Sequence, residues 1–124
     1  MRPSNWTLQY LPVYTQGVRR LLPLRRFLVE DTSMRPTIQP ADRLLVFQWA
    51  RPKPGDIVVL REPDARLTFV VKRVVSLEPN GDVIVHADNP NVSRDSREFG
   101  PVPRQLIVGR AIFRYLPAKT RGRL

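Results

Sequence analysis

The 124-residue chain contains no cysteine and a single histidine, His86. Disulfide bonds, cysteine nucleophiles and thiolate metal sites are therefore excluded, and one histidine is too few for a multi-histidine metal site. We expect neither a bound metal nor an organic cofactor. Lysine is also scarce, with three lysines against eighteen arginines, so the position of each lysine carries information.

Long hydrophobic runs are absent as well. Nothing in the sequence approaches the ~18 apolar residues of a membrane-spanning helix, and no cleavable targeting segment is evident. We therefore expect no transmembrane helix and a cytoplasmic protein. The stretch 18–29, with four arginines among leucines, leaves an alternative open: it leads into the first strand, or it lies on a membrane interface and places the protein at the inner face of the membrane.

The net charge of +10 is concentrated in the two terminal segments. Residues 1–30 and 114–124 each carry an excess of four positive charges, and the long middle part has an excess of only two. A nucleic-acid-binding protein more often places its excess charge on its folded working face, and the aromatic content of 8% offers no stacking platform. We expect no nucleic acid partner.

Thirteen prolines leave few windows long enough for a helix. The windows between them are rich in β-forming residues, and Asn80-Gly81 is a strong hairpin signal. The predicted strands are 26–31, 42–48, 56–61, 67–77, 82–86 and 106–116. They predict an all-β, mainly antiparallel barrel or sandwich with at most short helical turns. The predicted domain is 26–116, preceded by a basic, poorly ordered leader (1–25) and followed by a basic tail (117–124).

Two residues interrupt the β pattern in ways that suggest chemistry. Ser33 stands in a polar segment directly after an apolar strand, where the ordinary alternative is a cap for a one-turn helix. Lys72 lies inside a strand that is apolar on both faces, so either Lys72 or its neighbour Arg73 faces a hydrophobic wall. The ordinary alternative is an edge strand from which both cations reach water.

Together the two residues suggest a Ser–Lys pair, a form of nucleophilic catalysis that needs no histidine. A neutral lysine takes the hydroxyl proton as the serine attacks a carbonyl. Burial would lower the lysine pKa toward the roughly 7–8 that suits a general base. His86 lies among valines and is expected to be structural.

Three boxes in the sequence resemble those of the type I signal peptidases. Residues 33–37, Ser-Met-Arg-Pro-Thr, resemble the nucleophile box, and residues 71–73, Val-Lys-Arg, resemble the lysine box. Residues 88–97 are similar to a third box that begins with Asp-Asn and ends with Ser-x-Asp-Ser-Arg. The boxes occur in family order, and the resemblance covers about residues 29–115.

This resemblance implies roles for individual residues. Ser33 would be the nucleophile and Lys72 the general base, acting on a protein precursor that binds as an extended strand beside residues 28–31. A further set would orient the lysine and support its loop: Ser93, Asp95, Arg97 and Arg73.

The nucleophile box and the oxyanion region involve five positions. The backbone N–H of Ser33 would supply one oxyanion donor, Met34 would pack beside the nucleophile, and Pro36 would end the turn. Asp31 stands where the family often has serine or glycine. An ionised carboxylate there would repel the oxyanion, which leaves Thr32 as an alternative donor.

The short length of the chain, together with residues 99–103 and 107–111, most resembles the nickel-type superoxide dismutase maturation proteases. They imply a serine endopeptidase that removes an N-terminal leader peptide from a nickel superoxide dismutase precursor, so that any nickel belongs to the substrate. One alternative is a general type I signal peptidase that acts at the membrane on exported proteins. Another, of a different class, is a basic β-barrel that binds nucleic acid or a self-cleaving regulatory protein.

Overall fold

The computed structural model describes residues 8–11, 23–89, 91 and 94–124. In this part of the chain, strands alternate with turns, and helical structure is limited to one short α-helix and two 3₁₀ turns, which confirms the all-β prediction. The elements are β1 (Leu8–Leu11), β2 (Leu24–Val29), β3 (Arg43–Phe47), β4 (Ile57–Glu62), β5 (Ala65–Leu77), β6 (Val83–His86), α1 (Ser96–Phe99), η3 (Arg104–Leu106), β7 (Ile107–Leu116), η4 (Ala118–Thr120) and β8 (Gly122–Arg123).

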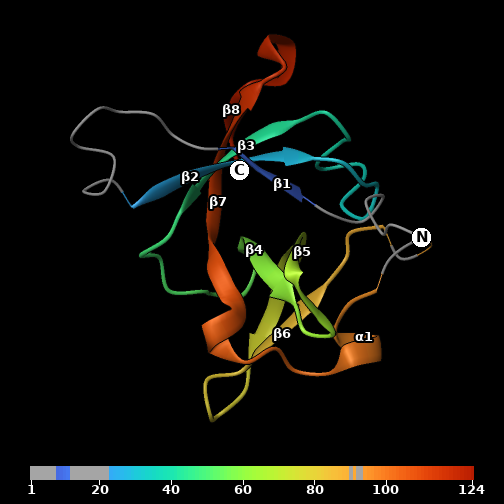
Figure 1. The fold of residues 1–124 in the computed structure, drawn as a ribbon, viewed down its shortest axis with the longest axis vertical. Helices are drawn as coiled ribbons and strands as arrows, with labels where there is room; N and C mark the ends of the chain where they lie inside the picture. Colours follow the sequence, from blue (N-terminus) through green and yellow to red (C-terminus); the bar gives the residue numbers. More distant parts are fainter. Residues whose placement is uncertain (1–7, 12–22, 90, 92–93) are drawn as a thin grey trace.

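Six of the strands form a closed antiparallel barrel. Their order is β1-β2-β3-β7-β4-β5, and the Leu8–Phe69 pairing of β1 with β5 completes the circuit. β7 pairs with β3 along one part of its length and with β4 along another, so it connects the upper and lower parts of the sheet as drawn in Figure 1. β6 extends the sheet beyond β5, and β8 pairs with β7.

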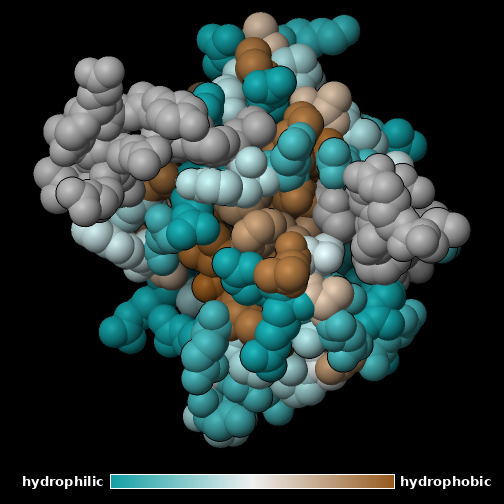
Figure 2. All heavy atoms as spheres, in the orientation of Figure 1, coloured by the Kyte–Doolittle hydropathy of each residue, from teal (hydrophilic) through white to brown (hydrophobic). Residues whose placement is uncertain are grey.

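Two hydrophobic clusters lie on opposite sides of the β4–β5 hairpin. One surrounds Phe27 and includes Met34 and Ile38 from the segment after β2. The other joins β4, β5 and β6 to residues near η3. On the face shown in Figure 2, hydrophobic side chains gather in the middle and polar side chains border them. Since both sides of β5 are covered by a core, the middle of β5 is buried on both faces.

The terminal segments contribute strands to this sheet. Leu8–Leu11, within the expected leader, forms β1, and Leu8 is buried in the core. Residues 1–7 and 12–22 of that leader lie outside the described part. Gly122–Arg123, within the expected tail, forms β8. No helix within the described residues has the length and apolar character needed to cross a membrane.

Candidate active site

Ser33 lies in a tight turn between β2 and β3. The Ile38 N–H donates to the Met34 carbonyl at 2.9 Å, and Met34 and Ile38 are anchored in the barrel core. This anchoring holds the turn against the sheet, so Ser33 is only 2% exposed. Pro36, by contrast, is exposed at the outer end of the turn.

Lys72 lies in the middle of β5, opposite Val58 of β4, and is 2% exposed. Its burial lowers the lysine pKa, and the nearby charges of Asp31, Asp95 and Glu62 oppose this shift without cancelling it. None of the ion pairs among the described residues includes Lys72. The position therefore favours the neutral amine, the form that can accept a proton.

The turn of Ser33 packs directly against the strand of Lys72. The Ser33 hydroxyl donates to the carbonyl of Val71, the residue before Lys72, at 3.5 Å. Asp31, two residues before Ser33, interacts electrostatically with Lys72. The serine and the lysine, 39 residues apart in the printed sequence, thus belong to one buried neighbourhood.

Asp88 joins the nucleophile turn to the lysine strand. Its carboxylate accepts two hydrogen bonds from the Arg73 guanidinium, at 2.9 and 2.8 Å, and one from the Thr37 hydroxyl at 2.7 Å. These bonds hold the Asp88 pKa below its usual value. The Asp88 N–H approaches Met34 Sδ at 3.4 Å. One carboxylate therefore fixes the spacing between the two segments.

Asn89 makes a second connection to the same turn. Its backbone N–H donates to the Ser33 carbonyl at 2.9 Å, and its side chain donates to the Thr32 carbonyl at 3.1 Å. Asn89, in the loop after β6, therefore fixes the positions of the Thr32 and Ser33 carbonyls. Asp88 and Asn89 were noted in the sequence only as part of a loop motif, and their bracing role was not predicted.

Asp95 is buried at the start of α1 and accepts hydrogen bonds from three donors. The Ala87 N–H donates at 2.8 Å, the Arg97 N–H at 3.0 Å, and the Arg97 guanidinium forms an ion pair at 2.6 Å. Although burial opposes it, these donors lower the Asp95 pKa to about 2. Arg73, which the resemblance placed in the same supporting set as Asp95 and Arg97, binds Asp88 instead. Ser93, expected to orient the lysine, lies outside the described residues.

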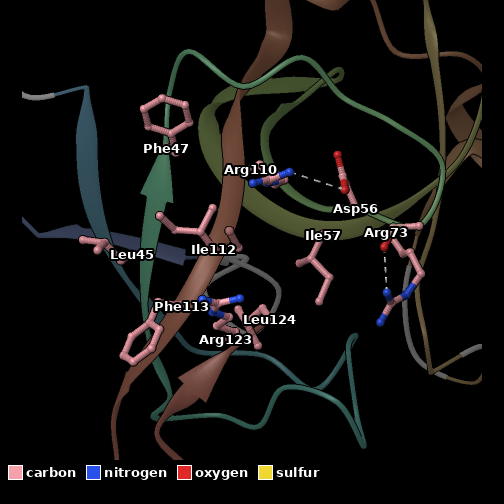
Figure 3. Close-up of a pocket in the computed structure, with 12 residues that line it drawn as sticks. Leu45, Phe47, Asp56, Ile57, Arg73, Arg110, Ile112, Phe113, Arg123 and Leu124 are labelled. Atoms are coloured by element: carbon pink, nitrogen blue, oxygen red, sulfur yellow. Dashed lines mark hydrogen bonds and ion pairs between the residues drawn. The ribbon is translucent and has the colours of Figure 1, made fainter.

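Arg73 points away from Lys72 because successive side chains of a strand alternate. It lines a pocket of about 700 Å³ with residues of β3, β4 and β7 (Figure 3). Its guanidinium donates to the Gly55 carbonyl at 2.9 Å. In the same pocket Arg110 forms an ion pair with Asp56 at 4.0 Å. Neither Ser33 nor Lys72 lines this pocket.

Two buried carboxyl groups near Lys72 differ in their partners. Glu62, which was not predicted, accepts from the Asp64 N–H at 2.7 Å and from Arg94 at 3.3 Å. Asp31 is 4% exposed, and neither of its carboxyl oxygens has a hydrogen-bond partner in the described part of the chain. Burial raises the Asp31 pKa, and Lys72 and the Ser33 hydroxyl and N–H oppose this shift without cancelling it.

An all-β barrel that buries a serine turn against a lysine strand agrees with the protein class that the comparisons identify. The family model described as signal peptidase, peptidase S26, matches residues 5–80 and 78–116, and the chain belongs to this family. It is a serine-type endopeptidase similar to signal peptidase I.

Among its relatives is the mitochondrial ATP-independent inner membrane protease subunit 1b of Arabidopsis thaliana. It is 36% identical, over 74% of this chain and 70% of the relative. The probable signal peptidase I-1 of Synechocystis is 29% identical over 98% of this chain and 90% of the relative. The mitochondrial inner membrane protease subunit 1 of Xenopus tropicalis is 36% identical over 74% and 69%.

Proposed function

We propose that this peptidase removes an N-terminal leader peptide from protein precursors, with Ser33 as the nucleophile and Lys72 as the general base. The observation that carries the proposal is that both side chains are buried and that the Ser33 hydroxyl contacts the backbone of the strand that carries Lys72. In such a buried position a lysine loses its proton more easily than in water.

The reaction begins with Lys72 as a neutral amine. Its nitrogen accepts the Ser33 hydroxyl proton as the Ser33 oxygen bonds to the scissile carbonyl carbon, and the carbonyl π electrons move to oxygen. The Ser33 N–H donates to this oxyanion. When the intermediate collapses, the lysine ammonium returns the proton to the leaving amine and an ester on Ser33 remains. A water molecule then gives a proton to Lys72 as its oxygen bonds to the ester carbon. When this second intermediate collapses, the bond to the Ser33 oxygen breaks, the lysine ammonium returns the proton to that oxygen, and the leader leaves as a carboxylic acid.

The proposed substrate lies as an extended strand near the end of β2. β2 is already paired with β1 and with β3 along its length, and the Val29 N–H donates to the Asp42 carbonyl. Residues 28 and 29 of the predicted binding segment 28–31 are therefore already paired, and we place the substrate against the residues that follow Val29.

The names of the relatives favour the broader of the two substrate readings. They are signal peptidases and inner membrane proteases, which supports precursors that are sorted at a membrane. A nickel superoxide dismutase precursor is a narrower hypothesis that no relative's name supports. The proposed location, cytoplasmic or at the inner face of a membrane, can be tested by fractionating a lysate at low and high salt.

The test is to incubate the purified protein with two precursors, one bearing an export signal peptide and one a nickel superoxide dismutase leader. Mass spectrometry then identifies each new N-terminus. Ser33→Ala and Lys72→Ala should lower the rate by about three orders of magnitude or more. Ser76→Ala in β5 and Lys53→Ala in an exposed turn are matched controls that should cleave normally. Wild-type rates in the Ser33→Ala protein would refute the proposal.

A further inference from the structure

Asp31 is the exception among the buried carboxyl groups of the described residues. Each of the others accepts hydrogen bonds: Asp42 from Gln39 and Arg114, Glu62 from Asp64 and Arg94, Asp95 from Ala87 and Arg97. Asp31 is equally inaccessible, at 4% exposed, and neither of its oxygens has such a partner. An ionised carboxylate in this position would be shielded from water, and no well-formed hydrogen bond within the described residues would compensate it, which is a costly arrangement.

Three groups of the reaction act electrostatically on the Asp31 carboxyl. The Ser33 hydroxyl, the Ser33 backbone N–H and Lys72 all favour its ionised form, and burial outweighs them. These are the attacking oxygen, the expected oxyanion donor and the general base. The carboxyl group therefore lies beside the place where negative charge develops in the proposed reaction.

We propose that Asp31 serves the reaction as an uncharged carboxylic acid. Its O–H supplies a second hydrogen bond to the oxyanion beside the Ser33 N–H, and loss of its proton inactivates the site. A neutral carboxyl has one donor, whereas a carboxylate accepts only and repels an oxyanion. Asp31 keeps its proton throughout the cycle and donates only a hydrogen bond. This inference rests on the proposed function.

The charge of Asp31 is coupled to that of Lys72. Four charged or titratable groups act on Lys72. Asp31 comes from the turn after β2, Glu62 from β4, and Arg94 and Asp95 from the loop before α1. At low pH the pair is an ammonium and an acid, and no base is present. Loss of the Lys72 proton gives a neutral amine beside a neutral acid, which is the active form. Burial favours this form over the zwitterion because neither group of the pair is then charged. A second deprotonation gives the carboxylate, so activity falls again and the pH profile is bell-shaped.

The experiment measures kcat and KM from about pH 5 to about pH 10 for the wild type, Asp31→Asn and Asp31→Leu. Asn keeps a donor that never ionises, so activity should stay within about tenfold of the wild type and the alkaline fall should disappear. Leu has no donor, so kcat should drop by about 10²–10³-fold while KM changes little. Since neither Asp31 oxygen makes a well-formed hydrogen bond within the described residues, we expect both variants to fold, which circular dichroism checks.

Three results would overturn the inference: a wild type without an alkaline fall, an Asn variant as inactive as the Leu variant, or a Leu variant with normal kcat. Each is distinct from failure of the proposed function. That failure would appear instead as an inactive wild type or as an active Ser33→Ala protein, whatever the residue at position 31.

Discussion

Replacing Lys72 with methionine should remove activity and make the protein more stable. Methionine has a similar length and no charge, and it suits the apolar surroundings of this position. Lys72 is 2% exposed, and no ion pair of the described residues includes it, so the substitution breaks no direct ionic contact in that part of the chain. Activity should be lost because the proposed mechanism then has no base for the Ser33 hydroxyl.

The size of the stability gain follows from the desolvation of the ammonium group. Replacing buried ionic groups by apolar residues of similar volume often stabilises by about 1–4 kcal/mol. For a domain of this length that corresponds to a rise in Tm of roughly 3–15 °C. The carboxylates of Glu62 and Asp95 attract the ammonium from nearby, so we expect a value near the lower end.

The gain should depend on pH with a definite sign. Burial lowers the Lys72 pKa below its ordinary 10.5. Between the lowered pKa of the folded protein and the ordinary pKa of the unfolded chain, the folded protein therefore binds fewer protons than the unfolded chain. Wild-type stability therefore rises with pH through this window. The methionine variant lacks this increase, and its advantage should be largest at acidic pH and should shrink toward the ordinary lysine pKa.

Urea unfolding followed by circular dichroism at about pH 5, 7 and 9 measures this difference. Lys53→Met, at an exposed lysine in the turn before β4, is the control and should change stability by less than about 0.5 kcal/mol. If Lys72→Met is less stable than the wild type at all three pH values, the ammonium is held by its charged neighbours and the argument for a neutral amine fails.

Two further substitutions test the scaffold. Gly109→Ala should destabilise the barrel by about 1–3 kcal/mol or more in thermal unfolding, because its Cβ would lie 2.5 Å from the Phe47 carbonyl oxygen. Gly122→Ala, with nothing within 4 Å, is the control, and equal effects would contradict the close approach. Asp95→Asn should lower the free energy of unfolding by about 1–2 kcal/mol near pH 7, because the Asp95 pKa of about 2 lies below its ordinary value. This range allows for solvent screening of the exposed partner Arg97. This cost should vanish as pH falls through about 2, and a cost independent of pH would refute the ionic origin.

The strands could be predicted from local sequence because proline spacing and residue type act locally. The predicted window 56–61 corresponds to Ile57–Glu62, and 106–116 corresponds to Ile107–Leu116. The barrel order could not be predicted. β7 pairs with both β3 and β4, and these pairings depend on how the whole sheet closes rather than on any local pattern.

The site was predictable to the same extent. Alternation along β5 indicated that one cation would be buried, and the structure shows that it is Lys72. It could not indicate that Arg73 binds Asp88, because Asp88 comes from a distant loop. The unpartnered burial of Asp31 was missed for a related reason: the charge state of a carboxyl depends on the donors that the folded chain brings to it, and these cannot be read from its neighbours in sequence.

The position of β1 has a consequence for what counts as the catalytic unit. β1 lies between β2, which leads into the serine turn, and β5, which carries the lysine, and it is paired with both. Removing these four residues would leave unpaired the edges of β2 and β5 that face β1, between the strand that leads to Ser33 and the strand that carries Lys72, and unpaired edges invite aggregation. The strand β1, which the sequence placed in a leader outside the domain, therefore closes the barrel.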